Sequence, residues 1–389
     1  MNTNKDDNNL NKNNNSYTGK SAKSKESNSP NATHKRRIHY SGTHPHKFEE
    51  KYKELNPEKY ADTIEKVISK GSTPAGMHIP IMVNEILDFL QIKPGQTGLD
   101  ATLGYGGHTM RMLEKLQHQG HLHGLDVDPI ESEKTKKRLL DAGFGEDILS
   151  VHLMNFADID KLYEKLGGST DSKNGFDFVL ADLGVSSMQI DNPERGFSYK
   201  IDGPLDLRLN PEKGISASER LKTISQAELE GMLISNSDEP YANIISKEII
   251  KALRKGQKIE TTSDLREVVE KALTLETSSD KKMTEDERKL LLKKTCQRTF
   301  QALRIDVNSE FEVLEEFMQK LPGIMNPGGR IAILTFHSGE DRIVKQYFKY
   351  YMKEGIYSLV SKDVVRPSLP ECSQNPRAHS TKMRWAIKN

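Results

Sequence analysis

The chain has 389 residues, and its 57 Lys and Arg nearly balance its 56 Asp and Glu, leaving a formal net charge of +1. At roughly 150 residues per domain this length allows two domains and a tail, and so small a net charge favours no class of partner. Two cysteines, Cys296 and Cys372, are too few for a disulfide framework or a four-thiolate zinc site. No apolar run approaches the roughly 18 residues of a membrane-spanning helix, and no signal peptide is recognisable. We therefore expect a cytoplasmic protein with no metal site and no membrane contact.

The N-terminal part of the chain divides into two segments of different composition. Residues 1–37 are rich in Asn, Ser and Lys and hold few apolar side chains, so they cannot bury enough surface to offset the entropy of ordering. We expect a disordered tail there, whose excess of basic residues could also attract polyanions loosely. Residues 38–76 carry aromatic side chains at amphipathic spacing and are predicted to form a helical N-terminal extension.

From His78 onward, strand patterns alternate with helix patterns. Four apolar segments have the composition of strands, and the segments between them have helical periodicity. The predicted strands are TGLD, HLHGLDVD, ILSVHLMNF and FDFVLADLGV, and the predicted helices are MVNEILDFL, HTMRMLEKLQ and PIESEKTKKRLLDAG. Continuously apolar strands joined by helices predict a parallel sheet that is covered on both faces.

The alternation stops at residues 192–294, where helical segments dominate. EPYANIISKEIIKALRKG ends at Gly256, a plausible C-cap, and TTSDLREVVEKAL has Thr261 and Asp264 at capping-box spacing. We interpret this stretch as a helical insertion into one α/β domain formed by residues 77–191 and 295–389. A role for the insertion in recognising the substrate is a hypothesis.

The α/β pattern then resumes. One helix is predicted over TFQALRIDVNSEFEVLEEFM, followed by the loop NPGGR, the strand RIAILTF and the helix GEDRIVKQYFKYYM. The closing segment STKMRWAIK is predicted to form an antiparallel edge strand that pairs with IYSLVSKDV.

A glycine loop follows the first predicted strand. Gly104, Gly106 and Gly107 lie between Asp100 and a helix, where missing side chains let a ligand approach the backbone. Asp126 ends the next strand at a spacing that suits the hydroxyls of an adenosine ribose. Thr109 stands where a dinucleotide fingerprint needs Gly or Ala, and no P-loop motif is present. S-adenosylmethionine is therefore the expected cofactor, with Asp100 near its ammonium group; the alternative is a strand-turn-helix whose glycines serve packing alone.

Two further strand ends carry candidate site residues. Phe156 ends the third strand, where it can stack on an adenine ring or wall its pocket, although an isolated Phe is more often part of the core. Asp182 ends the fourth strand after a run of apolar residues. Because open parallel sheets bind ligands outside the carboxyl ends of their strands, Asp182 is expected to face the reaction site.

Ten short motifs follow one another along the chain from His78 to the C-terminus, and together they resemble those of a known protein family. The sequence resembles the ribosomal RNA small-subunit methyltransferase H family, also called MraW. The motifs are HIPIMVNEIL, DATLGYGGHT, GLDVDP, DLGVSS, ERGFS, DGPLDLRL, RTFQALRI, PGGR, FHSGEDRIVK and NPRAHS. The resemblance implies a Rossmann-like class I S-adenosylmethionine-dependent methyltransferase fold with an inserted helical domain. It also implies methylation of the N4 exocyclic amine of a cytosine in the decoding region of 16S rRNA, with 16S rRNA or the 30S subunit as partner, and relatives suggest a homodimer.

Carried over position by position, the resemblance implies a set of cofactor contacts: Gly106, Gly107, His108, Asp126, Phe156, Asp182 and Gln189. His108 and Gln189 rest on the resemblance alone. The family usually has Leu where Gly339 stands and Pro-Ala-Thr where Thr295, Cys296 and Gln297 stand, and Gly339 and Gln297 are expected on the substrate side.

Asp182 is the predicted catalytic residue. It would orient the exocyclic amine and stabilise the charge that builds on it, and His337 and Ser338 could close the site. Because the target base must leave its stack, we expect single-stranded or loop RNA. Phosphate contacts are expected from the basic segment 281–298 and from Arg377, Lys382, Arg384 and Lys388 beside Trp385.

Three other functions fit parts of the sequence. An NAD-dependent oxidoreductase shares the sheet and the ribose acid, but Thr109 argues against it. A non-catalytic RNA-binding assembly factor could keep the fold without the chemistry. A paralogue could methylate a different RNA cytosine.

Overall fold

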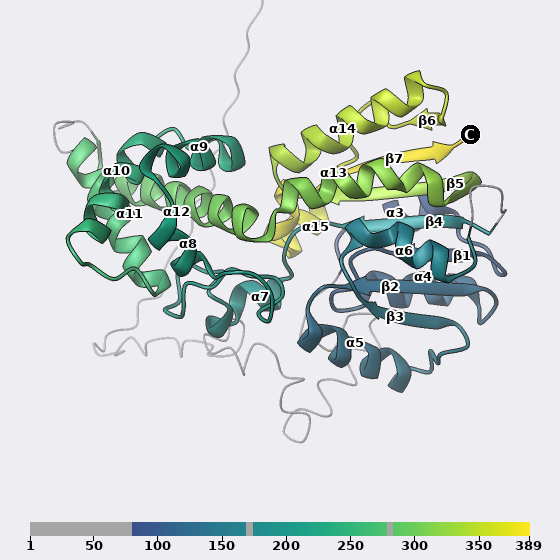
Figure 1. Ribbon diagram of the computed structural model, residues 1–389. Coiled ribbons are helices and arrows are strands. Elements are labelled where there is room, and N and C mark those ends of the chain that lie inside the picture. The colour runs from purple at the N-terminus through teal and green to yellow at the C-terminus, as the bar shows by residue number, and fades with distance from the viewer. Residues whose placement is uncertain (1–79, 169–173, 278–282) are drawn as a thin grey trace, which may run out of the picture. The chain divides into compact units, whose positions relative to one another are not determined.

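The computed structural model describes residues 80–168, 174–277 and 283–389 (Figure 1). The predicted tail at 1–37 and helical extension at 38–76 lie outside the described residues. Within the described ranges, no helix is long and apolar enough to cross a membrane. Cys296 and Cys372 are both buried and form no disulfide.

A seven-stranded sheet organises the α/β part. Its strands are β1 (Thr97–Asp100), β2 (His121–Asp126), β3 (Leu149–Leu153), β4 (Phe176–Asp182), β5 (Met325–Thr335), β6 (Tyr357–Val360) and β7 (Lys382–Lys388). They are ordered β3-β2-β1-β4-β5-β7-β6; β1 to β5 are parallel and β7 is antiparallel to both neighbours. This order confirms the predicted α/β, Rossmann-like fold. It also puts a topological switch between β1 and β4, where such sheets bind ligands.

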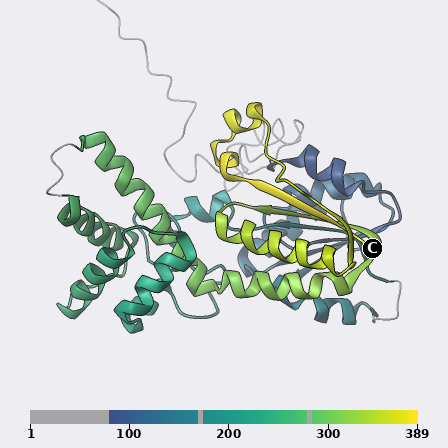
Figure 2. The ribbon, with the colours of Figure 1, turned by 90° about the horizontal axis from the view of Figure 1, so that it is seen from above.

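Helices cover both faces of the sheet, as the apolar strands predict. One face packs against α3 (Val83–Leu90), α4 (Gly107–Leu116) and α5 (Pro129–Asp141) through a core that includes Met82, Met112 and Leu180. The other packs against α6 (Ile159–Lys165), α13 (Glu310–Lys320) and α14 (Ser338–Lys353) through Val179 and Phe317. Figure 2 shows α13 and α14 on one side of the strands and the purple-blue α3 on the other.

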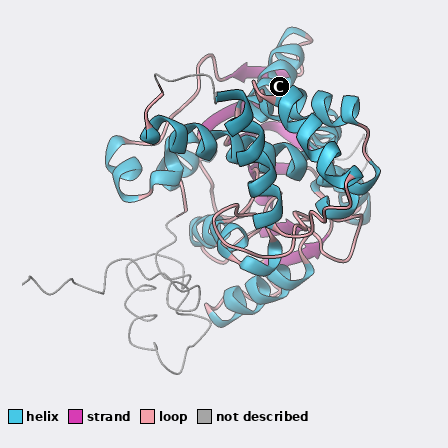
Figure 3. Cartoon of the chain, turned by 90° about the vertical axis from the view of Figure 1, so that its left-hand side faces the viewer, coloured by secondary structure: helices cyan, strands magenta, loops and turns pink. Residues whose placement is uncertain are grey.

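The described residues of 192–277 and 283–308 form helices with a core of their own. The helices are α8 (Ala217–Thr223), α9 (Gln226–Ser237), α10 (Ala242–Arg254), α11 (Thr262–Thr277) and α12 (Glu285–Asn308). Leu229, Ile245, Val269 and Phe300 are among the buried residues of this core, and Figure 3 shows its cyan helices in front of the magenta strands. The predicted capping box of α11 is present, because Thr261 and Asp264 each accept the other's backbone amide, at 2.8 and 3.1 Å.

Short helices complete the described chain. They are α7 (Ser187–Asp191), α15 (Leu369–Gln374) and the 3-10 turns η2 (Phe156–Asp158), η3 (Pro193–Arg195), η4 (Leu321–Ile324) and η5 (Pro376–Ser380). Several of them follow strands or enter the helical region, so they border the carboxyl edge of the sheet.

Three local predictions need correction. The single helix predicted over residues 299–318 is two helices, because Ser309 adopts φ 48° between α12 and α13. The predicted loop NPGGR belongs to β5, which accommodates it through a register shift against β4. The closing strand β7 pairs with β6 as predicted, but it is not an edge strand, because it lies between β5 and β6.

Candidate active site

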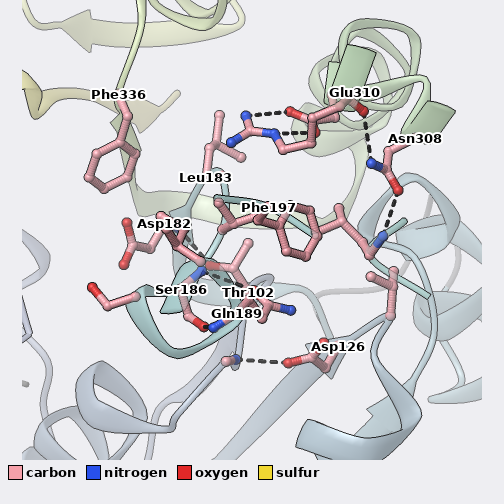
Figure 4. A pocket seen from close by; sticks show the side chains of 18 of the residues that line it. Thr102, Asp126, Asp182, Leu183, Ser186, Gln189, Phe197, Asn308, Glu310 and Phe336 are labelled. Carbon is pink, nitrogen blue, oxygen red and sulfur yellow. Dashed lines mark hydrogen bonds and ion pairs between the residues drawn. The ribbon is translucent and has the colours of Figure 1, made fainter. Parts of the chain in front are cut away.

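A cleft of about 1170 Å³ opens at the carboxyl ends of β1 to β4. One part of the cleft is formed by the loops that follow these strands, and it lies low in the view of Figure 4. The other part, which lies higher in that view, is formed by residues of the helical region and of α12 to α14. In Figure 4, Asp126 and Gln189 lie at the bottom of the view, Asp182 lies on the left, and Asn308 and Glu310 lie at the top right. The cleft therefore brings the strand ends of the α/β part and the helical region together.

The glycine loop approaches the cleft closely. Gly107 and His108 line it, whereas Gly106 lies behind the lining and packs on α5. Gly106 has φ 71°, and a Cβ at this position would meet Thr135 Cγ2 at 2.9 Å. Glycine is thus required at position 106 by both the turn and the approach of the two helices. Of the predicted loop residues, Gly104, Gly107 and His108 can meet a ligand directly, and Gly106 cannot.

Asp126 is fixed by the backbone of the glycine loop. One carboxylate oxygen accepts the Gly104 amide and the other accepts the Asp128 amide, both at 2.9 Å. Burial raises the pKa of the Asp126 carboxyl to about 6, although these two amides oppose the rise. Each carboxylate oxygen has a second lone pair, so both can still accept a hydroxyl from the cleft. The structure therefore puts Asp126 where the sequence predicts a ribose acid.

Phe156 lies beside the cleft as the first residue of η2. Its ring packs edge-on against Phe317, with 5.1 Å between the ring centroids, and it also lines the cleft. Both sequence interpretations hold in part, because one side of the ring joins the core and the other can wall a ligand pocket.

Asp182 and His108 meet at the floor of the cleft. Asp182 Oδ2 lies 3.5 Å from His108 Nδ1, and 28% of the Asp182 side chain is exposed. Asp182 Oδ1 has no hydrogen-bond partner in the described part of the chain. Burial raises the pKa of Asp182 to about 6; His108 opposes the rise, while Asp100 and Glu340 add to it. Because Oδ1 itself is buried, a ligand in the cleft would meet the exposed remainder of this side chain.

Gln189 is oriented by two contacts. Its carbonyl accepts the Ser186 amide at 2.9 Å in the capping box of α7, and its amide donates to Asp128 Oδ2 at 3.2 Å. The side chain lines the cleft in this fixed orientation. Gln189, which the family resemblance implies as a cofactor contact, therefore does face the cleft.

Asp100 does not lie where the sequence suggested. Its side chain is buried, with Oδ2 accepting the Thr109 hydroxyl at 2.5 Å and Oδ1 accepting the Thr102 amide at 3.1 Å. It is absent from the cleft lining. The predicted contact with a ligand ammonium group is therefore wrong for Asp100, and Thr109 has a structural role in holding this carboxylate.

Gly339 and Gln297 have different outcomes. Gln297 lines the cleft as expected. Gly339 does not line the cleft. It packs against Phe311 so closely that a Cβ at this position would meet Phe311 Cζ at 2.4 Å. The ring of Phe311 fills this space and lies 5.7 Å from the ring of His337, which does line the cleft.

Sequence reasoning missed a buried ion pair that joins the two halves of the cleft. Arg195 donates to Asp128 Oδ2 at 2.6 Å and to the carbonyl of Leu209 at 2.8 Å. Asp128 is fully buried and also caps α5 by accepting the Ile130 amide at 3.0 Å. The motifs GLDVDP and ERGFS contain these residues, but nothing in either motif indicates that the two pair.

A second cluster of charged residues lies around the start of α13 and α14, and only His337 of it was singled out from the sequence. Arg304 donates two hydrogen bonds to Glu310, at 2.8 and 2.9 Å, across the break at Ser309. His337 caps α14, and its Nε2 lies 3.1 Å from Glu340 Oε1. Burial favours a raised pKa for Glu340, but His337, the Phe336 amide and Arg304 together lower it.

The same cluster contains an arrangement that could hold a metal ion. Ligand atoms of Glu310, His337 and Glu340 lie within 4.8 Å of one another. Both oxygens of Glu310 already accept from Arg304, and a guanidinium at that distance competes with a cation. The cluster is better explained as an ion-pair network.

The basic segments contribute unequally to the cleft. Arg377 and His379 line it, and Lys293 and Lys294 are exposed on α12. Arg384 is buried against Asp341 at 2.7 Å, and Trp385 stacks on Phe89. Arg384 and Trp385 therefore hold the sheet rather than phosphates, and that part of the prediction is wrong.

Comparison with known proteins identifies the family. A sequence profile of the MraW methylase family matches residues 75–389. This chain belongs to the MraW methylase family. The cofactor expected from the sequence, S-adenosylmethionine, is the methyl donor of this methylase.

Three curated relatives cover nearly the whole chain. "Ribosomal RNA small subunit methyltransferase H 1" of Agathobacter rectalis is 67% identical over 355 residues, which is 91% of this chain and 98% of that protein. The protein of the same name from Lachnoclostridium phytofermentans is 63% identical over 382 residues, 98% of this chain and 99% of its own length. "Ribosomal RNA small subunit methyltransferase H 2" of Alkaliphilus metalliredigens is 58% identical over 353 residues, 91% of this chain and 97% of that protein.

The residues of the cleft fit the cofactor of the MraW methylase family. Asp126 offers acceptors for ribose hydroxyls, Phe156 offers an aromatic wall, and Gly107 exposes backbone at the N-terminus of α4. The donor set is acidic and aromatic, which suits a cationic sulfonium nucleoside better than a phosphate. When bound, the cofactor supplies an electrophilic methyl group.

Proposed function

We propose that this protein methylates the N4 exocyclic amine of a cytosine in the decoding region of 16S rRNA. Membership of the MraW methylase family supports methyl transfer, and the names of the three relatives support small-subunit rRNA as the substrate class. The observation that carries the proposal is the partly exposed carboxylate of Asp182, which lines the cleft beside the cofactor half.

An exocyclic amine needs an acceptor of this kind. Its lone pair is delocalised into the ring, so the amine is a poor nucleophile and becomes acidic as it takes the methyl group. A carboxylate that accepts one amine hydrogen orients the lone pair and stabilises the charge that develops. Burial increases this electrostatic effect because water does not screen it.

The upper part of the cleft can hold a base that has left its stack. Phe197 and Phe336 line the cleft, and both are labelled near Asp182 in Figure 4. Aromatic rings provide the stacking surface that an extruded base requires. Gln297 and Gln301 project from α12 toward the same space and offer amide groups for its polar edge. His337 lines this space too, while Ser338 forms only a weak surface contact with Asp238 at 3.3 Å.

We assign recognition of the ribosomal substrate to the helical region. Its α12 reaches the cleft through Gln297 and exposes Lys293 and Lys294 beside it. Exposed lysines near an active site attract the RNA backbone in a salt-dependent way. The 30S subunit or its 16S rRNA is the expected partner. The homodimer and the cytoplasmic location predicted from the sequence stay predictions.

Mapping of modified bases tests the proposed function. The 16S rRNA of a strain lacking this gene is compared with that of the parent by mass spectrometry, and 30S subunits from the deletion strain are then treated with purified enzyme. We expect one N4-methylated cytosine to disappear on deletion and to return with the enzyme, but not with Asp182→Ala. An unchanged cytosine modification pattern would contradict the proposal and would favour a non-catalytic assembly factor.

A second candidate is methylation of a different cytosine of small-subunit rRNA. The relatives above 55% identity carry a number after the letter H in their names, whereas relatives at 33–38% identity do not. The Phe311 ring also packs between Gly339, where the family usually has Leu, and His337 at the cleft. The same mapping experiment distinguishes the two candidates, because it gives the position of the modified base.

A further inference from the structure

Aspartates and glutamates outnumber lysines and arginines in the described lining of the cleft. The acids are Asp126, Glu131, Asp158, Asp182, Asp191, Glu310 and Glu340, and the lysines and arginines are Lys200, Lys213, Arg304 and Arg377. Arg304 pairs with Glu310 at 2.8 Å, and Arg377 pairs with Asp191 at 2.9 Å. These two guanidinium groups are therefore already balanced by acids, and an RNA strand at the cleft needs other cations to offset the repulsion.

Two lysines of one loop remain available. Lys200 and Lys213 belong to the loop of residues 197–214, are exposed and line the cleft. Neither forms an ion pair with any residue in the part of the chain that the structure describes. The Lys200 ammonium lies 6.0 Å from the centroid of the Tyr199 ring, a weak exposed contact that leaves its hydrogen-bond donors free. Each ammonium group thus has three N–H donors for a ligand.

The acids of the 197–214 loop do not compete for these lysines in the cleft. Hydrogen bonds with Ser263 lower the pKa of Asp202, and Asp206 pairs with Arg208 at 2.6 Å. Glu212 is exposed, and none of the three acids lines the cleft. The loop therefore presents its lysines to the cleft and keeps its carboxylates out of the lining.

Contacts from two sides fix the end of the loop that carries Lys213. Arg195 donates to the carbonyls of Arg208 and Leu209 at 3.1 and 2.8 Å. Asn308, labelled in Figure 4, accepts the Leu209 amide at 2.7 Å. The backbone is thus held by the buried ion pair on one side and by the end of α12 on the other, while the long lysine side chain can adjust to a ligand.

We propose that Lys200 and Lys213 bind the RNA phosphates that flank the target nucleotide, and this inference rests on the proposed function. A strand whose base has turned into the cleft places its neighbouring phosphates at the cleft mouth. The acidic lining repels those phosphates, and unpaired ammonium groups offset the repulsion through charge-assisted hydrogen bonds. The lysines of α12, Lys293 and Lys294, lie outside the lining and would contact RNA farther from the target.

Matched pairs of substitutions test this assignment. Lys200→Gln and Lys213→Gln, made singly and together, remove the charge and keep most of the side-chain length. The control combines Lys345→Gln with Lys349→Gln. Both control lysines are exposed on α14, lie outside the cleft lining and have no ion-pair partner among the described residues. The two double variants therefore change the net charge equally and differ in the place of the lost charges.

Binding to 30S subunits from the deletion strain is measured by cosedimentation with S-adenosylhomocysteine present, between about 50 and 300 mM KCl. Each phosphate contact with a single strand contributes about 0.7 to the slope of log affinity against log salt, or about fivefold in affinity at 0.1 M relative to 1 M salt. We expect each single variant to bind about fivefold more weakly at 0.1 M salt, and the double variant about 25-fold, with a slope lower by about 1.4. The control should stay within about twofold of the wild type.

Three results would overturn the inference. If the double variant keeps the wild-type affinity and salt slope, the loop does not hold phosphates. If the control pair weakens binding as much as the loop pair, only net charge matters. Calorimetry with S-adenosylhomocysteine gives the third: a loss of cofactor affinity as large as the loss of 30S affinity would assign the lysine to the carboxylate of the cofactor.

Failure of the proposed function looks different from these results. The wild-type enzyme would then produce no N4-methylcytosine in 30S subunits, whereas the binding measurement does not depend on which atom receives the methyl group.

Discussion

The two sides of the cleft are built in different ways. On the cofactor side, Asp126 is held by the Gly104 and Asp128 amides that belong to neighbouring strand ends. On the helical side, Arg304 holds Glu310 across a helix break, and Asn308 donates to the carbonyl of Leu207 and accepts the Leu209 amide. The first side depends on strand topology, and the second also depends on contacts between segments about a hundred residues apart, such as those of Asn308. We therefore expect chemistry and cofactor binding to depend on the first side, and RNA binding on the second.

The largest effect is expected where the chemistry lies. Asp182→Asn keeps the shape of the side chain but cannot accept a proton, so single-turnover methylation should fall by about 10²- to 10⁴-fold. Because Asp182 is also an expected cofactor contact, affinity for S-adenosylhomocysteine should fall too, but by much less than the rate. A variant that methylates 30S subunits at the normal rate would remove Asp182 from the reaction.

The ion pair that joins the two sides should dominate stability. Arg195→Met leaves Asp128 buried without its guanidinium, which is expected to lower the free energy of unfolding by about 3–5 kcal/mol. The matched control is Arg377→Met, whose partner Asp191 lies near the surface; that pair should contribute less than about 1 kcal/mol. Urea denaturation of both variants checks the difference. Equal losses would mean that the buried pair does not hold the two sides together.

Cofactor affinity should depend on Asp126 and on pH. Hydrogen bonds to a charged acceptor contribute about 1.5–3 kcal/mol, so Asp126→Asn should weaken S-adenosylhomocysteine binding by roughly 10- to 100-fold. The pKa of Asp126 is raised to about 6 in the folded protein. Binding should therefore weaken as the pH falls through 6, because the protonated acid accepts fewer hydrogen bonds. Calorimetry at pH 5 and pH 7.5 measures this change, which should be smaller in Asp126→Asn, where Asp182 still titrates near pH 6 in the cleft.

Substitution of Asn308 is expected to weaken binding of the RNA substrate and to leave binding of the cofactor unchanged. Asn308→Ala removes the partner of the Leu209 amide and of the Leu207 carbonyl, at a cost of about 1–3 kcal/mol in local order. The KM for 30S subunits should rise while affinity for S-adenosylhomocysteine stays unchanged. A loss of cofactor affinity in this variant would show that the two sides of the cleft are not separable.

The effect that is smallest at neutral pH concerns the sheet beneath the cofactor side. Burial, together with the neighbouring His121 and His152, lowers the pKa of His123 to about 3. Below pH 6.5 the unfolded chain takes up a proton at this position that the folded protein does not, so His123 reduces stability between pH 6.5 and about 3. His123→Leu should remove this term. The difference in unfolding free energy between variant and wild type should grow by at most about 1.4 kcal/mol per pH unit on acidification, and a flat difference would contradict it.

The sequence was informative at the carboxyl ends of the apolar strands. Asp126, Phe156 and Asp182 follow apolar strands, and parallel strands end at the same edge, so their approach to one cleft followed from topology alone. The same rule failed for Asp100, because the sequence does not reveal that the Thr109 hydroxyl turns this carboxylate inward. A strand-end acid is therefore a site candidate only until its local donors are known.

Long-range contacts limited the rest of the prediction. Arg195 and Asp128 lie 67 residues apart, and neither motif indicates that the other is its partner. The break at Ser309 was missed because apolar periodicity continues across it, although Asn308 and Ser309 are residues that favour turns. The loop NPGGR was missed because Pro and Gly usually end strands, whereas here a register shift keeps them within β5.

The contact between Asp128 and Arg195 has a consequence for how this family diverges. A single carboxylate serves a guanidinium, the amide of Gln189 and the first turn of α5 at once. If only one of the two charged residues is replaced, the other stays buried without its partner. A lineage is therefore expected to lose the pair through both changes together. Positions 128 and 195 should therefore covary among relatives, even though they belong to different signatures of the sequence.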